Sequence, residues 1–467
     1  MTIKNLLAIL TLSFFTIQIQ QQLTKMSKEP FNKTILNPNE TLTRGELENL
    51  QLRHLRDCVR RLADVPFYKQ KFAEHGVNHE SIRSLNDISR LPLTTKADLR
   101  NGYPLGFLAV PREVVARFHG SSGTTGKPTI VAYTPDDLKL WSELCARFLV
   151  SGGLQSRHTV QIAFGYGLFT GGFGLHYGVE RVGAAVIPAA AGNTRRQLML
   201  MQDMQTDVLV CTPSYALTIA DVLRNDNIDP ASLTLKYAHL GGETWTEQMR
   251  ETIESSLGIL AFNNYGLSEV IGPGVSGECI ERTGMHIQED HFLVECLDPE
   301  TLKPVPNGKP GELVITAMTK QAMPILRYRT RDIAVLYDDE CPCGRTTRRM
   351  SRVIGRSDDM MIIRGVNVFP SQIEEALLRV EGAAPHYQIE LTRPGTLDEV
   401  RVKVEVVPEK FSDKLADMAS LKRRIEQEVT TITGLHITID LLPPKSIDRF
   451  EGKAKRVIDL RGMKVEV

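Results

Sequence analysis

Short β-branched runs alternate with stretches of helical periodicity between about residues 100 and 330. Residues 208–211 and 313–316 are typical of strands, and residues 247–257 are typical of a helix. Because such alternation builds strand–helix–strand units, it predicts an α/β fold around a mostly parallel sheet. Of the 467 residues, 42% are apolar and 24% are charged, which allows a large core and excludes a disordered chain or a small disulfide scaffold.

A second, smaller unit is predicted after Gly355, where the pattern changes. In this part of the chain, strand patterns (residues 359–364, 400–406 and 437–442) alternate with helix patterns (residues 370–379 and 415–429). We therefore predict a large domain over residues 26–357 and a small, mobile α+β domain over residues 358–467. The polar stretch that contains Gly355 suits a hinge, which we expect near Asp358.

The first 25 residues, 1–25, form an apolar N-terminal extension that has two interpretations. Lys4 precedes an apolar run over residues 6–17, which is similar to the core of a signal peptide. The run is shorter than the roughly 20 residues that a membrane span takes, and no small-residue cleavage site follows it. Since Met26 opens a conventional polar start, we favour an upstream extension or a misassigned start over export or membrane tethering.

Charge and cysteine content favour a cytoplasmic protein with small-molecule partners. Lys plus Arg and Asp plus Glu each total 56, so no net positive charge would attract nucleic acid or an anionic membrane. The seven cysteines are odd in number and thinly spread, which is typical of reduced thiols in a reducing compartment.

Cys341 and Cys343 are the exception in their spacing, because two thiols on one tight turn can share a metal ion. Cys279 and His286 could complete a Cys₃His site for a structural Zn²⁺. The alternative is a set of buried or free thiols.

A loop at residues 121–129 has the composition of a phosphate-binding loop, since it combines glycines, hydroxyls and a lysine. It is not the P-loop of nucleoside triphosphatases. That motif needs glycine where this chain has Ser121, and Ser or Thr where it has Pro128. A flexible surface turn is the alternative interpretation.

Four further motifs follow the loop in order, at residues 264–269 (NYGLSE), 328–332 (YRTRD), 355–358 (GRSD) and 451–454 (EGKA). Together with the loop they resemble the adenylate-forming superfamily, which includes acyl-coenzyme A synthetases, adenylation domains and luciferases. The segments 165–172, 364–370 and 452–456 narrow the resemblance to phenylacetate–coenzyme A ligases. The resemblance covers roughly residues 36–467.

The resemblance implies an AMP-forming acid–thiol ligase whose substrates are a carboxylic acid, ATP and coenzyme A. ATP and the acid would first give an acyl-adenylate and pyrophosphate, and the thiol of coenzyme A would then displace AMP. The catalytic residues implied are Lys453 and Glu269, with Glu269 also holding Mg²⁺. Asp358 would be the hinge of a lobe rotation between the two steps, and Gly365 would lie against the pantetheine arm of coenzyme A.

The nucleotide-binding residues implied by the same resemblance are Ser121, Ser122, Gly123, Thr124, Thr125, Gly126, Lys127, Gly241, Gly242, Glu243, Asn264, Tyr265, Gly266, Ser268, Asp332 and Arg356. Asp332 would accept hydrogen bonds from the ribose hydroxyls with the help of Arg356. Tyr265 would stack on adenine.

Phe164, Tyr166 and Phe169 lie in a glycine-rich segment and could form a planar slot for an aromatic ring. The resemblance implies phenylacetate as the leading acid, with another aryl acid, or a carrier protein as thiol acceptor, as alternatives. The aromatic residues could instead belong to the core. A non-catalytic adenylate-binding protein is the alternative of a different class, and self-association as a homodimer is a further prediction.

Overall fold

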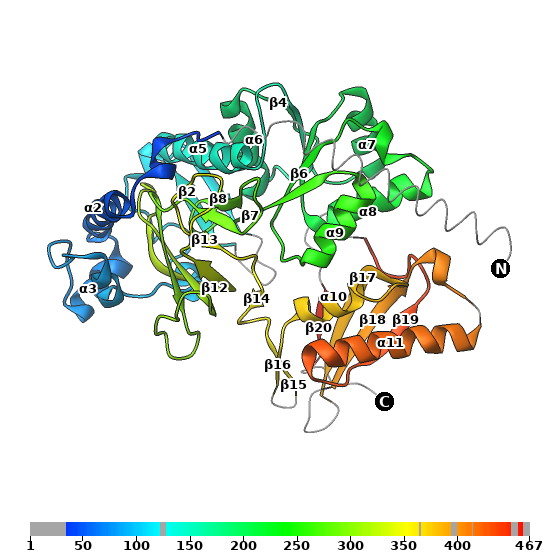
Figure 1. Cartoon of the computed structure of the whole chain (residues 1–467). Coiled ribbons are helices and arrows are strands. Elements are labelled where there is room, and N and C mark those ends of the chain that lie inside the picture. The colour runs from blue at the N-terminus through cyan, green and yellow to red at the C-terminus, as the bar shows by residue number, and fades with distance from the viewer. Residues whose placement is uncertain are drawn as a thin grey trace.

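The computed structural model describes residues 34–121, 128–363, 366–393, 399–412, 414–449 and 456–460 (Figure 1). The described chain opens with helices α2 (Arg44–Leu62), α3 (Pro66–His75) and α4 (Lys96–Asn101) and three short 3₁₀ turns, Pro38–Thr41, Leu85–Arg90 and Arg112–Val114. Thr43 caps α2, because its side chain accepts from the Glu46 N–H while Glu46 bonds back to Thr43. No helix within these ranges is both long and apolar enough to cross a membrane.

One large sheet of twelve strands runs through the first part of the molecule, which we call the large lobe. Its parallel half consists of β4 (Ala185–Ile187), β3 (Thr159–Ile162), β5 (Val208–Cys211), β6 (Tyr237–Leu240) and β7 (Leu260–Leu267) in spatial order. The crossovers run through α6 (Gly171–Val182), α7 (Thr194–Asp203), α8 (Pro213–Asn225) and α9 (Glu247–Leu257). The α/β class predicted from the sequence is confirmed.

The parallel strands are buried on both faces. Along β5, Val208 and Val210 belong to one core cluster, whereas Leu209 and Cys211 belong to a second cluster on the opposite face. The first cluster includes residues of α5 (Pro135–Ser151) and α6, and the second includes residues of α7, α8 and α9. Burial on both sides explains why these strands are continuous hydrophobic runs in the sequence.

The other half of the sheet is antiparallel, so the prediction of a mostly parallel sheet is wrong there. Its strands are β8 (Gly272–Glu278), β9 (Met285–Ile287), β10 (Phe292–Leu297), β11 (Pro310–Ala317), β12 (Ile325–Tyr337), β13 (Arg349–Met350) and β14 (Gly355–Arg356). The physical reason is the short connections, which leave no room for the crossover helix that a parallel pair needs. A separate hairpin joins β1 (Arg117–Gly120) and β2 (Ile130–Tyr133).

The small lobe follows β14 and has a core cluster of its own, drawn from residues 361–457. Its elements are β15 (Met361–Ile363), β16 (Val366–Val368), α10 (Pro370–Leu378), β17 (Ala383–Thr392), β18 (Glu399–Val406), α11 (Leu415–Thr433), β19 (Thr438–Leu442) and β20 (Val457–Asp459). Four of them form a sheet in the order β19-β18-β17-β20, against which α10 and α11 pack. In Figure 1 this lobe, in orange and red, lies beside α9 and is reached through β14.

Candidate functional site

A cavity of about 660 Å³ lies where β7, β12 and β14 meet the N-terminal end of α4. The sequence-predicted residues that line it are Ser121, Phe164, Phe169, Gly242, Glu243, Asn264, Tyr265, Gly266, Ser268, Glu269, Asp332, Arg356 and Asp358. Segments that are up to 264 positions apart in the chain, from Thr95 to Asp359, therefore converge on one cavity. Ser122–Lys127, Gly365 and Lys453 lie outside the described residues.

Asp332 is the centre of a hydrogen-bonded group on one wall of the cavity. The pairing of β12 with β14 sets Asp332 opposite Arg356, whose Nη1 donates to Asp332 Oδ1 at 3.0 Å. The Tyr265 hydroxyl donates to Asp332 Oδ2 at 2.7 Å. Burial raises the pKa of Tyr265, and the charge of Asp332 adds to that rise, so the phenol stays a donor. The carboxylate is thus fixed in place, with lone pairs left for a ligand.

Arg356 also links this wall to Asp358, the predicted hinge residue. Its Nε and Nη2 donate to the two oxygens of Asp358, each at 2.9 Å, while Nη1 bonds Asp332. One guanidinium therefore bridges Asp332, which lines the cavity, and Asp358, which lies where the chain leaves the large lobe.

The turn at residues 241–243 requires its glycines. A Cβ at Gly241 would lie 2.7 Å from the backbone and side-chain oxygens of Asn264, and Gly242 has φ +84°, a conformation that L side chains rarely adopt. Asn264 holds the turn by donating from Nδ2 to the Leu240 carbonyl at 2.9 Å. Glu243 accepts a hydrogen bond from the Ser214 N–H at 2.6 Å. Of the two glycines, Gly242 lines the cavity.

Glu269 provides a second acid, at the α4 end of the cavity. Its side chain is 7% exposed, and Lys96 Nζ lies 3.6 Å from its Oε1. The neighbouring Ser268 hydroxyl bonds the Thr170 hydroxyl at 2.8 Å. A carboxylate, of the kind that can bind a divalent cation, and an ammonium, of the kind that can bind an anion, therefore lie side by side.

Lys96 was not among the residues predicted from the sequence. It is the first residue of α4, after the capping residue Thr95, and 173 positions separate it from Glu269. Its local signal is that of an ordinary capped helix, so nothing near it in the sequence could have shown its place in the cavity.

The predicted aromatic slot is only partly present. Phe164 and Phe169 line the cavity together with Leu175 and Trp245. A Cβ at Gly171 would lie 3.1 Å from the Phe169 ring, so the glycine lets that ring pack closely.

Tyr166 is not among the residues that line the cavity. Its hydroxyl is 3.2 Å from His176 Nδ1, and its ring packs edge-on against Phe173. The two phenylalanines thus form the apolar wall, without a contribution from Tyr166.

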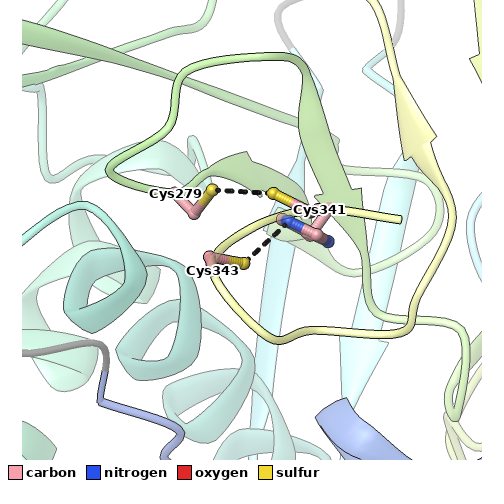
Figure 2. A group of neighbouring side chains, drawn as sticks. Cys279, Cys341 and Cys343 are labelled. Atoms are coloured by element: carbon pink, nitrogen blue, oxygen red, sulfur yellow. Dashed lines mark hydrogen bonds between the residues drawn. The ribbon is translucent and has the colours of Figure 1, made fainter. Parts of the chain in front are cut away.

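The four metal-ligand candidates converge at a second place. Cys279 follows β8, His286 lies in β9, and Cys341 and Cys343 lie between β12 and β13. All four are buried, and their ligand atoms lie within 4.8 Å of one another. In Figure 2 the sulfurs of the three cysteines point toward one another. This Cys/His cluster is composed of three thiols and one imidazole.

The distances in the Cys/His cluster do not fit a disulfide. Cys279 Sγ and Cys341 Sγ are 3.7 Å apart, whereas a disulfide is about 2.05 Å long. Cys343 Sγ is 3.3 Å from His286 Nε2, and His286 Nδ1 is 3.1 Å from the Thr347 hydroxyl. Hydrogen bonds from Cys279 and His286 lower the pKa of Cys343 despite its burial. A lowered pKa favours the thiolate, the form that binds metals.

The Cys/His cluster is also tied to the start of the described chain. Arg345 donates to Glu40 at 2.6 Å and to the Thr34 carbonyl at 2.8 Å. The Thr346 N–H donates to the Glu40 carbonyl at 3.1 Å. The turn that carries two of the thiols therefore holds the segment that precedes α2.

Comparison with known proteins gives two family matches along the chain. Residues 109–321 match the family described as AMP-binding enzyme, and residues 365–461 match the AMP-binding enzyme C-terminal domain. A phenylacetate-coenzyme A ligase of Thermus thermophilus is 49% identical over 437 residues, which cover 90% of this chain and 98% of that protein.

Solved structures of 2-hydroxyisobutyryl-CoA ligase are similar in fold. The complex with R3-HIB-AMP in the postadenylation state gives a TM-score of 0.86 at 28% identity and covers 92% of this chain and 94% of that chain. The complex with 2-HIB-AMP and CoA in the thioesterification state gives a TM-score of 0.68 at 29% identity, with 92% and 95% covered.

Proposed function

The chain belongs to the family of phenylacetate–coenzyme A ligases, and on this premise we propose that it joins phenylacetate to coenzyme A in two steps. In the first step the acid carboxylate attacks the α-phosphorus of ATP and pyrophosphate leaves, which gives phenylacetyl-adenylate. In the second step the thiol of coenzyme A loses its proton and attacks the acyl carbon, and AMP leaves. The protein is thus an AMP-forming acid–thiol ligase.

The observation that carries this proposal is the distribution of chemistry within one cavity. Asp332, fixed by Tyr265 and Arg356, can accept hydrogen bonds from the two ribose hydroxyls. Glu269 and Lys96 provide a cation-binding and an anion-binding group at the α4 end. An apolar wall of Phe164 and Phe169 adjoins both. A site that binds a nucleotide, its polyphosphate and an aryl acid requires these three kinds of group.

Lys453 and Mg²⁺ would neutralise charge as the two anions approach each other. Glu269 has the oxygen ligand and the burial that suit Mg²⁺, which would supply charge neutralisation on the phosphates and leaving pyrophosphate. The hydroxyls and N–H groups of the loop 121–127 would hold the phosphates. Lys453 would donate to the carboxylate and α-phosphate oxygens as they react. Asp358, with Arg356 as its partner, would be the pivot, and Gly365 would lie along the pantetheine arm.

A second candidate acid is favoured by the composition of the apolar wall. Phe164 carries no hydroxyl, so the described wall places no phenol there to select a ring substituent. Another aryl or arylacetic acid would then compete with phenylacetate, since one pocket group changes selectivity by about 1–3 kcal/mol. A carrier protein presents the same pantetheine thiol as coenzyme A and is the alternative acceptor.

Acid-dependent pyrophosphate release tests the proposal. Protein begun at Met26 is given ATP, Mg²⁺ and a panel of aryl and aliphatic acids, with and without coenzyme A. We expect phenylacetate to give the fastest release, coenzyme A to drive turnover, and Lys453→Ala to abolish release. Folded, ATP-binding protein that releases no pyrophosphate with any acid would favour the non-catalytic alternative.

We further propose that the Cys/His cluster holds a structural Zn²⁺. A tetrahedral ion with Zn–S bonds of about 2.3 Å places two sulfurs roughly 3.8 Å apart, close to the 3.7 Å between Cys279 and Cys341. Donation from His286 Nδ1–H to the Thr347 oxygens orients the ring and leaves Nε2 for the metal. Metal analysis should find one zinc per chain and none in Cys343→Ser. Cys211→Ser, which removes a buried thiol elsewhere, should keep its zinc.

The state of the cysteines supports a cytoplasmic location. All seven lie in the described ranges, and none forms a disulfide. Reduced thiols of this kind are typical of a reducing compartment. Cell fractionation with N-terminal sequencing would test this proposal and show whether the chain in the cell begins at Met1 or Met26.

A further inference from the structure

Two polar contacts among the described residues connect the small lobe to helices α8 and α9 of the large lobe. In the first, Asp221 of α8 accepts from His386 Nε2 of β17 at 2.8 Å. Arg449 Nε lies 3.9 Å from the same carboxylate. Arg449 is itself held by Glu405, which accepts from both terminal nitrogens at 2.8 Å. One acid of the large lobe is therefore paired with two basic side chains of the small lobe.

In the second contact, Glu374 of α10 meets Thr246, the capping residue of α9. The Thr246 hydroxyl donates to Glu374 at 3.3 Å. From the small lobe, the Tyr387 hydroxyl donates to Glu374 at 2.8 Å, and Arg456 forms an ion pair with it. Glu374 is 2% exposed, so this group is closed to water.

The second contact lies close to groups of the proposed reaction. Thr246 is three residues after Glu243 in the turn that borders the cavity. Arg456 is three residues after Lys453 in the sequence. Glu374 therefore joins Thr246 of the large lobe to Arg456, which lies three positions after the lysine that the adenylation step requires.

The orientation of the small lobe in this structure resembles one of two states of a related ligase. The match is TM-score 0.86 with the postadenylation state and 0.68 with the thioesterification state, although both comparisons cover 92% of this chain. Because coverage and identity are nearly equal, the difference between the two scores lies in the relative position of parts of the chain.

We propose that Asp221 and Glu374 are positioning residues that hold the small lobe in the adenylation orientation and release it before thioester formation. The inference rests on the proposed function, whose second step requires the other orientation. Asp221 engages His386 and Arg449, and Glu374 engages Thr246.

The two contacts between the lobes, which together we call the latch, are weak enough to form and break reversibly. After release, Glu374 keeps Tyr387 and Arg456, and Asp221 keeps Arg224 on its own helix. Each of the two acids therefore keeps a partner of its own lobe among the described residues when the lobes separate. His386, Asp221 and Arg449 are 14%, 25% and 28% exposed, so water weakens their attraction. We expect each contact to change the balance of orientations by about three- to tenfold.

Separate measurement of the two half-reactions tests the proposal. Adenylation is followed as phenylacetate-dependent exchange of labelled pyrophosphate into ATP. Thioester formation is followed in a single turnover from preformed phenylacetyl-adenylate and coenzyme A. Asp221→Asn and His386→Ala should each slow exchange about three- to tenfold and leave thioester formation unchanged or faster. In the double variant, pyrophosphate exchange should be no slower than in the slower of the two single variants, because both substitutions remove the same contact.

Two matched controls separate the latch from general stability. Arg224→Ala removes the other partner of Asp221 without touching the small lobe, and Arg401→Ala removes a pair with Asp440 inside the small lobe. Both controls should leave the ratio of the two half-reactions as in the unmodified protein. An equal fall in both half-reactions for Asp221→Asn, or no change in either, would overturn the proposal.

A second measurement does not depend on activity. All seven native cysteines are buried, so spin labels can be placed selectively at Lys139→Cys on α5 and Arg423→Cys on α11. We expect one main distance in the parent protein and a second, enlarged population in Asp221→Asn. Unchanged distances would contradict the latch. A parent protein without acid-dependent exchange would instead contradict the proposed function, while the label distances would still decide on the latch.

Discussion

The cavity and the Cys/His cluster are both assembled from distant segments, but they differ in how their polar groups are satisfied. At the cavity, the buried Ser121 hydroxyl and the Trp245 ring N–H have no hydrogen-bond partner among the described residues. In the cluster, each thiol and the imidazole contact another member. Groups left unsatisfied cost stability unless a ligand pairs with them, so the cavity is built for a ligand that comes and goes. The Cys/His cluster, whose groups contact one another, suits the resident Zn²⁺ that we propose.

Asp332→Ala should give the largest effect and should be confined to the cavity. It removes the acceptor that Tyr265 and Arg356 hold in place, so we expect kcat/KM for ATP to fall by roughly 100-fold. Zinc content and Tm should stay close to those of the parent. Steady-state kinetics and metal analysis on one preparation check this.

The control for that variant is Asp338→Asn, an exposed acid just after β12 that pairs with Arg348. It should change kcat/KM less than twofold. A loss of zinc in Asp332→Ala would show that the two regions are not independent.

Cys343→Ser should give the converse result. Because a structural metal contributes its binding energy to folding, we expect Tm to fall by about 5–10 °C and zinc to be lost. The cluster holds the segment before α2 through Arg345, so that segment should also become sensitive to limited proteolysis. At a temperature where the variant is folded, kcat should stay within about threefold. A large loss of kcat in folded protein would assign the cluster a part in the reaction.

The predicted site residues that one motif places together, and that line the cavity together, are on a short, continuous segment. Tyr265, Ser268 and Glu269 are neighbours in the chain and remain neighbours in the cavity. Asp332 could be grouped with them only through the resemblance to a family, because the pairing of β12 with β14 is a tertiary contact.

What the sequence could not show depends on packing between distant elements. Lys96 has the pattern of an ordinary capped helix, and its partner Glu269 is far along the chain. Tyr166 lies among cavity residues in sequence, yet its side chain pairs with His176 of α6. The antiparallel half of the sheet likewise follows from connection lengths, which the strand patterns alone do not reveal.

Lys320→Met tests whether the cavity side of the molecule carries an unpaired charge. Lys320 is 1% exposed, has no hydrogen-bond partner among the described residues, and lies 4.4 Å above the Tyr133 ring. Burial lowers the pKa of Lys320 to about 8, against the attraction of Asp137 and Glu269. We expect methionine, which packs without a charge, to raise Tm by about 2–4 °C.

The pH dependence of that gain follows from the direction of the shift. The folded state binds the proton of Lys320 less tightly than the unfolded chain does. The loss of stability from burying the charged ammonium is therefore full below about pH 8, and it fades as the pH rises toward 10.5, the ordinary pKa of lysine. The Tm difference between Lys320→Met and the parent should therefore shrink as pH rises from 8 to 10. Lys309→Met, at an exposed lysine, should show neither the gain nor the trend. A variant that loses stability would show that Lys320 is satisfied in solution.

Phe164→Tyr should give the smallest effect. It sharpens the contrast between the apolar wall of the cavity, which a ligand contacts, and the Cys/His cluster. The ring is 8% exposed and borders an open cavity, so an added hydroxyl can be accommodated and can meet a polar substituent on the acid. We expect the ratio of kcat/KM for 4-hydroxyphenylacetate to that for phenylacetate to rise about two- to fivefold, with Tm unchanged.

Tyr166→Phe is the matched control, because its hydroxyl pairs with His176 outside the cavity lining, and it should leave that ratio constant. A change in the ratio for Tyr166→Phe alone would mean that Tyr166, and not Phe164, faces the bound acid. The acyl wall would then have to rearrange when the acid binds, and the cavity would differ from the Cys/His cluster in the mobility of its side chains as well as in their pairing.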